Sequence, residues 1–151
     1  MKPESIAADH FRNGRVMQIA TLHDGQPRVN SVYYVAADDN RAVYWMSETR
    51  RRHSKDIGSD ARIGGAVAVK TDQPAAGLQF TGIANEVTDP DEVKAVAGKY
   101  NQKYDGVAND FYERFMAGTN VHHVYKIVIT DLELFDEVNF PGGEVISVPL
   151  G

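Results

Sequence analysis

The spacing of apolar residues changes after the first thirteen positions of the chain. Ile6, Ala7 and Phe11 recur at helical spacing, which predicts a short opening helix over residues 3–13. From Val16 onward, short apolar or alternating runs are separated by turn residues, a pattern typical of strands. Strands are predicted at residues 16–22, 28–36, 42–47, 62–70, 78–87 and 121–135, with a short last one at 144–148.

Turn and cap residues divide these strands and indicate further helices. Asp24-Gly25 is a hairpin signal between the first two strands. The polar segment 48–60 predicts a short helix bounded by Gly58. Thr88 or Asp89 is suited to cap a helix, and another is predicted at 109–116. The capped helix carries Val93, Val96, Ala97 and Tyr100. The longest strand is expected to bend near Asp131.

This order of elements predicts a single domain over residues 1–151. A helix is followed by antiparallel strands with short turns, then a helical insert and a long strand. Five consecutive short strands with hairpin turns favour a barrel or a sandwich. No repeat, linker or low-complexity tract interrupts the pattern.

Composition narrows the function classes. The chain has 16 Lys and Arg against 21 Asp and Glu residues, a formal charge of −5, which argues against a nucleic-acid partner. It has no cysteine, so disulfides, zinc–thiolate sites, iron–sulfur clusters and cysteine nucleophiles are excluded. No apolar leader or membrane-length apolar stretch is present, which predicts a cytoplasmic protein without a membrane partner.

One short segment departs from the acidic character of the chain. Residues 50–55, Arg-Arg-Arg-His-Ser-Lys, contain four of the 16 Lys and Arg residues. They follow a strand and lie at the start of a predicted helix, where backbone N–H groups also favour anions. Arg guanidinium groups match phosphate geometry. Two interpretations stay open, an anion site and a solvated basic turn that pairs with nearby acids.

Other chemical motifs are missing. The sequence has no G-x-S-x-G elbow, P-loop or G-x-G-x-x-G, so a hydrolase triad, a nucleotide kinase and a Rossmann dehydrogenase lack support. His122 and His123 are adjacent and would face opposite sides of a strand, so they cannot bind one metal together. No metal site is predicted. The acids Asp136 and Glu137 are expected to be solvated on a strand face.

Several segments, in their order and spacing, carry a family resemblance. They are MQIATL at 17–22, GQPRVNSVYY at 25–34, VYWMS at 43–47, the basic segment, and LQFTGIANEV at 78–87. The chain resembles the pyridoxamine 5′-phosphate oxidase-like, FMN-binding split β-barrel superfamily over nearly its whole length, and its small bacterial members with no assigned reaction in particular. The resemblance implies a mainly β fold with six or seven antiparallel strands in Greek-key-like order and flanking helices.

The resemblance also implies a homodimer with two FMN molecules in clefts between the subunits. Residues of the second strand would lie beside the flavin ring and its ribityl chain. Residues that end the third strand would approach the ring or the phosphate. Arg52 and His53 form the basic pair that would hold the phosphate. Lys55 would supplement that pair, and a residue on the 78–87 strand would point toward the ring. The implied cofactor-binding residues are Asn30, Ser31, Val32, Met46, Ser47, Arg52, His53, Lys55 and Gln79.

Three departures from the family pattern bear on the binding of FMN and of the substrate. His53 stands where many relatives have Lys or Arg, and Val35 where the oxidases proper place another phosphate-binding Lys. The oxidases proper also hold their substrate phosphate with basic residues near the C-terminus. Here Lys126 is the only Lys or Arg after Arg114. Pyridoxamine 5′-phosphate is therefore not the expected substrate.

Four functions remain open from the sequence. The first is an FMN-dependent oxidoreductase acting on a small-molecule substrate or electron donor, since the flavin needs no acid–base constellation. The second is a non-catalytic flavin-binding redox or stress protein. The third is a member of the same fold that binds F420 or haem, with His122 or His123 as axial ligand. The fourth is a dimeric domain that has lost its cofactor site.

Overall fold

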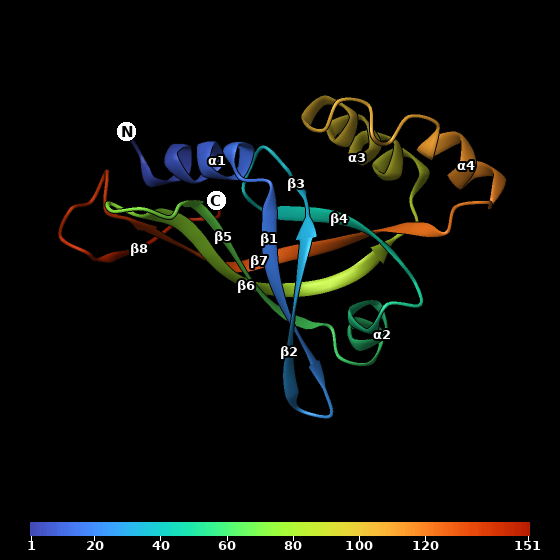
Figure 1. The fold of residues 1–151 in the computed structure, drawn as a ribbon, viewed down its shortest axis with the longest axis horizontal. Coiled ribbons are helices and arrows are strands. Elements are labelled where there is room, and N and C mark those ends of the chain that lie inside the picture. The colour runs from blue at the N-terminus through green and yellow to red at the C-terminus, as the bar shows by residue number, and fades with distance from the viewer.

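The strands form an antiparallel sheet that curls into an open barrel, as the computed structural model of residues 1–151 shows (Figure 1). They are β1 (Val16–His23), β2 (Gln26–Tyr33), β3 (Val35–Ala36), β4 (Ala42–Glu48), β5 (Arg62–Lys70), β6 (Ala76–Val87), β7 (His122–Asp136) and β8 (Val145–Ser147). The path of hydrogen-bonded neighbours is β2-β1-β5-β6-β7-β4-β3, and β8 pairs with β7. The predicted fold class is confirmed: the path has seven strands, and β8 is an additional short one.

Four helices flank this sheet, as predicted. They are α1 (Pro3–Asn13), α2 (Arg52–Ser59), α3 (Pro90–Lys103) and α4 (Phe111–Ala117). Asp89 caps α3 by accepting a hydrogen bond from the backbone N–H of Glu92 at 2.9 Å, which confirms one of the two predicted caps. In Figure 1, α1 lies along one side of the curled sheet, whereas α3 and α4 pack together at one end of β4 and β7. None of these helices combines the length and apolar character needed to cross a membrane.

Two apolar clusters hold the helices against the sheet. The cluster inside the curl includes Trp45 and Tyr125, whose stacked rings lie 5.4 Å apart, and Phe11 of α1. The other cluster joins α3 and α4 to β3, β4 and β7. It contains the four apolar residues predicted for the first of these helices: Val93, Val96, Ala97 and Tyr100. The fold therefore has a barrel core and a separate apolar layer under the helical insert.

The prediction of one strand over residues 28–36 is wrong at Tyr34. The Tyr34 side chain is fully buried, and its hydroxyl donates to the Phe11 carbonyl at 2.8 Å. Its backbone N–H faces the Tyr104 hydroxyl and the Arg15 carbonyl, at 3.2 and 3.3 Å, instead of a strand. The chain leaves β1 at Tyr33 and pairs with β4 from Val35 onward. An aromatic side chain that enters the core thus divides the segment into β2 and β3.

The long strand β7 has its irregularity at Thr130, next to the predicted bend. Thr81 of β6 pairs with Asp131, and Gly82 pairs with Ile129, so Thr130 is an extra residue. A Cβ on Gly82 would come within 2.3 Å of the Val128 carbonyl oxygen. Glycine is therefore required where the two backbones approach at this bulge.

The expectation that Asp136 is a solvated acid is wrong. Its side chain is buried and accepts hydrogen bonds from the side chain and backbone of Asn139, at 2.7 and 2.8 Å. His10 of α1 lies 2.9 Å from the same carboxylate. These donors hold the pKa of Asp136 below its usual range despite burial. The carboxylate ties the chain after β7 to the first helix.

Candidate functional site

A cavity of about 520 Å³ lies where the ends of β2 and β4 meet the start of α2. We call it the basic cavity. It is lined by Asn30, Ser31, Val32, Met46, Ser47, Glu48, Arg51, Arg52, His53 and His122. Its volume falls in the range of small-molecule and cofactor sites.

Helix α2 supplies the positive charge of this cavity. The helix begins at Arg52, and no side-chain hydrogen bond caps its N-terminus, so its first backbone N–H groups have no side-chain acceptor. The Ser54 hydroxyl donates to the Glu48 carbonyl at 2.9 Å and closes the turn before the helix. The local sequence therefore brings amide donors and arginine side chains to the same place.

A buried carboxylate anchors α2 to the sheet. Asp56 accepts hydrogen bonds from the hydroxyl of Thr21 at 2.8 Å and from the guanidinium of Arg28. The bonds from Arg28 lower the pKa of Asp56 and outweigh the opposing effect of its burial. The carboxylate thus fixes α2 on the hairpin of β1 and β2.

The three arginines of the basic segment differ in their partners. Arg50 pairs with Glu48, whereas Arg51 and Arg52 form no ion pair. Arg52 donates only to the Val29 carbonyl, at 3.2 Å. Both unpaired guanidinium groups border the basic cavity. The interpretation of this segment as a turn paired with nearby acids fits Arg50 but not Arg51 or Arg52.

His53 lies deeper than the arginines. Its Nε2 lies 2.9 Å from the hydroxyl of Ser47, and both side chains are buried. Burial, and then the neighbouring Arg51, lower the pKa of His53 below its ordinary value. In the ligand-free protein His53 is therefore a neutral hydrogen-bonding group near neutral pH rather than a third fixed cation.

The cavity wall also contains an unpaired polar atom. The Nδ2 atom of Asn30 is buried and has no hydrogen-bond partner in the protein. Leaving such a donor unsatisfied costs about 1–3 kcal/mol. With the unpaired arginines and the free N–H groups of α2, this donor set fits an anionic ligand that carries acceptor oxygens, such as a phosphate ester.

A second cavity of about 540 Å³ adjoins the first and shares Met46 and His122 with it. We call it the aromatic cavity. Its other lining residues are Tyr33, Tyr100, Val107, Phe111, Arg114, Thr119, Asn120 and Val121. The pair of cavities therefore joins a cationic part to an apolar and aromatic part, as a flat ligand with one anionic end requires.

Seven of the nine residues expected at the site line the basic cavity, and two do not. Lys55 lies two residues beyond His53 on α2, a spacing that places the two on different faces of a helix, and it is exposed. Gln79 lies on the outer face of β6, opposite Ala66 and Glu133 of the neighbouring strands. Val35, which stands where the oxidases proper have a lysine, is buried away from this cavity.

Three lining residues were not predicted as cofactor-binding from the sequence. Glu48 and Arg51 lie within or next to the basic segment, so its charge pattern is a signal that could have identified them. His122 is suggested by the sequence only as an axial ligand, and it reaches both cavities because β7 pairs it with Glu48 of β4. No group of three or more His, Asp or Glu side chains is placed to hold a metal ion.

Residues 6–136 match the protein family described as pyridoxamine 5′-phosphate oxidase. A search of curated proteins found no match. The matched segment includes both cavities and most of the sheet.

Solved structures share the fold at low sequence identity. A conserved hypothetical protein from Mycobacterium tuberculosis aligns with a TM-score of 0.77 and 20% identity, over 99% of this chain and 93% of its own. A heme-binding protein from Mycobacterium smegmatis aligns with a TM-score of 0.73 and 18% identity, over 99% and 60%. An FAD-binding protein from Mesorhizobium loti aligns with a TM-score of 0.61 and 17% identity, over 86% and 91%.

Proposed function

The chain belongs to the pyridoxamine 5′-phosphate oxidase family, and on this premise we propose that it binds FMN and acts as a flavin-dependent oxidoreductase. The observation that carries the proposal is the basic cavity, where Arg51, Arg52 and the N-terminus of α2 converge without a carboxylate partner of their own. A phosphate group would pair with both guanidinium groups and accept from the free N–H groups. The unpaired Asn30 amide would donate to a further oxygen of the ligand.

The protein contributes binding and orientation, whereas the bound flavin supplies hydride or electron transfer at its N5 atom. The aromatic cavity next to the basic cavity provides room for a flat ring and a small substrate. Arg114 is the single Lys or Arg that lines it, and its Nε donates to Asn120 at 2.8 Å. Lys126 is held by Glu92 at 2.7 Å. A second phosphate clamp is therefore missing, which supports a substrate other than pyridoxamine 5′-phosphate.

We further propose that the flavin site is completed by a second copy of the chain. The outer face of the sheet carries exposed apolar residues on β2, β6 and β7: Val29, Tyr33, Ile83 and Val128. Between them lie small residues of β1 and β5: Ala20, Gly64 and Ala66. Ser31, which lines the basic cavity, lies on this same face of β2. A partner seated on this face would therefore border the cavity, and Gln79 of one subunit would meet the site only across that interface.

Titration with FMN tests the assignment. We expect the wild-type protein to bind FMN with a shift of the flavin absorbance spectrum, and Arg52→Ala to weaken binding by roughly ten- to a hundredfold. The reason is the loss of a charge-assisted hydrogen bond, worth about 1.5–3 kcal/mol. The measurement is the dissociation constant from absorbance or fluorescence titration at fixed ionic strength.

Lys55→Ala is the matched control, because it removes a cation from the same helix outside the cavity. Its effect on the dissociation constant should stay within about threefold. Equal weakening by both variants, or no binding of FMN to the wild type, would contradict the site. Turnover of a reduced nicotinamide with an electron acceptor separates the enzyme from a flavin carrier that binds without reaction.

FMN affinity is expected to depend on pH through His53. Burial lowers the pKa of His53 in the free protein, and a bound phosphate would raise it, so binding takes up a proton. FMN affinity should be highest below the pKa of His53 in the free protein. It should fall with rising pH until the pH exceeds the pKa of His53 in the FMN complex. Each unit of difference between the two pKa values is worth about tenfold. His53→Gln removes this titration, and an unchanged pH profile in that variant would contradict the role of His53.

Haem is the second candidate ligand, favoured by the position of one side chain. His122 borders both cavities and is exposed, so its imidazole is available as an axial ligand. The similar fold of a heme-binding protein adds to this candidate. Titration with haem should then give a Soret band shift that is lost in His122→Ala, whereas FMN binding should respond more strongly to Arg52→Ala. F420 carries a long acidic tail, for which the basic cavity offers no further row of cations.

A further inference from the structure

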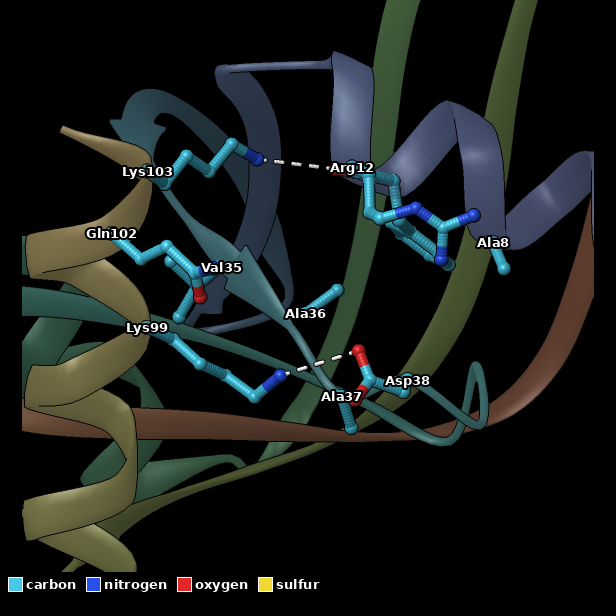
Figure 2. A pocket seen from close by; sticks show the side chains of 10 residues that line it. Ala8, Arg12, Val35, Ala36, Ala37, Asp38, Lys99, Gln102 and Lys103 are labelled. Atoms are coloured by element: carbon cyan, nitrogen blue, oxygen red, sulfur yellow. Dashed lines mark hydrogen bonds and ion pairs between the residues drawn. The ribbon is translucent and has the colours of Figure 1, made fainter.

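A third pocket lies between α1, β3 and α3, as Figure 2 shows. Its volume is about 260 Å³, and it shares no lining residue with the basic or the aromatic cavity. We call it the lysine pocket. The proposed flavin site makes no use of it, and neither the fold nor that site accounts for its charge.

The charge of the lysine pocket is opposite to that of the whole chain. Arg12, Lys99 and Lys103 line it, with Asp38 as the one acid, so its formal charge is 3 − 1 = +2. The chain as a whole carries −5. In Figure 2 the three cationic side chains stand around a floor formed in part by Val35 and Ala36. The pocket therefore combines cations at its rim with an apolar base.

Lys103 is the cation with the least compensation. It is half-buried, its ammonium donates to the Phe11 carbonyl at 3.1 Å, and it lies 4.1 Å from the centre of the Tyr34 ring. Both partners are neutral, and no carboxylate pairs with it. Burial, and then the nearby Arg15, lower its pKa to about 8. An anion in the pocket would supply the missing counter-charge.

The other two cations are held by weak surface pairs. Lys99 lies 3.3 Å from Asp38, whose side chain is 85% exposed. Arg12 pairs with Asp9 of its own helix, and its side chain is 59% exposed. Exposed pairs of this kind contribute little to stability. Both cations are therefore free to turn to a ligand at little cost.

We propose that the lysine pocket is a binding site for a small carboxylate with a short apolar body. The carboxylate would pair with Lys103 and Lys99, and the apolar body would cover the floor at Val35 and Ala36. At about 30 Å³ for each water-sized group, the pocket holds roughly nine such groups, which suits an aromatic or branched monocarboxylate. FMN exceeds this size, so the pocket is a site of its own.

Calorimetric titration with benzoate, butyrate and inorganic phosphate tests the proposal on the full-length protein at constant ionic strength. We expect saturable binding of benzoate, tighter than that of butyrate or phosphate. Lys103→Met should weaken benzoate binding by about tenfold or more, because a charge-assisted contact is lost. Lys99→Met should weaken it by a few fold and keeps the test valid if Lys103→Met does not fold.

Lys94→Met is the matched control, since Lys94 lies on the same helix over the Tyr112 ring and outside the pocket. It should leave benzoate binding unchanged. Three results would each overturn the proposal: no saturable binding of benzoate to the wild type, equal losses in Lys94→Met and the two pocket variants, or equal affinity for phosphate and benzoate. The proposal stands independently of FMN binding, because the two sites share no residue.

Discussion

Replacing Asp56 with alanine is expected to lower the free energy of unfolding by about 3–5 kcal/mol. The Asp56 side chain is 1% exposed and accepts hydrogen bonds from Thr21 and Arg28. Its loss leaves the buried Thr21 hydroxyl and a largely buried guanidinium without their acceptor. Urea denaturation followed by circular dichroism measures the change. FMN binding should weaken in the same variant, because Asp56 anchors the helix that carries Arg52 and His53.

Asp60→Ala is the control for this prediction. Asp60 follows the same helix and pairs with Arg62, whose side chain is 71% exposed, so the loss of stability should be much smaller than that in Asp56→Ala. Because the pKa of Asp56 is lowered on folding, its contribution is present above the pKa of the unfolded chain and is lost as pH falls through the folded value. Equal stability of Asp56→Ala and Asp60→Ala would show that the anchor is not needed.

The sequence predicted the elements well where local signals and tertiary structure agree. The strand at residues 62–70 has the predicted bounds, and the Asp89 cap begins α3. The errors arise where distant contacts override local preference. Nothing near Tyr34 shows that its hydroxyl reaches the Phe11 carbonyl and interrupts the strand. Asp110 adopts a left-handed conformation, so α4 begins at Phe111 rather than at residue 109.

The candidate site was also predictable only where a local signal in the sequence marks it. The charge run at residues 50–55 pointed to the segment that lines the basic cavity without any knowledge of the fold. Which of its cations face the cavity depends on where α2 begins, and this excludes Lys55. The contribution of His122 depends on the pairing of β7 with β4, and that of Arg114 on the packing of α4. Pairing between distant segments leaves no local pattern in a single sequence.

Replacing Ile83 with lysine is expected to dissociate the proposed dimer and to weaken FMN binding with it. Ile83 is 45% exposed, pairs with Val128 across β6 and β7, and lies opposite Arg62 of β5. Each subunit with a lysine here would bring an unpaired positive charge into the interface. We expect this to weaken dimer association by about 2–5 kcal/mol in total. The dimer dissociation constant should therefore rise by about thirtyfold to several thousandfold. Sedimentation at micromolar concentration measures it, with and without FMN.

Val138→Lys serves as the control, because Val138 is a similarly exposed aliphatic residue in the turn after β7, outside the strands that form the proposed face. It should leave both the dimer and the FMN affinity unchanged. If the wild-type protein is monomeric at micromolar concentration yet binds FMN through Arg52, the proposed dimer is wrong and the proposed FMN site in the basic cavity stands. Loss of FMN affinity in parallel with dissociation of Ile83→Lys would mean that the cavity needs the partner, since Ser31 shares its face with the interface.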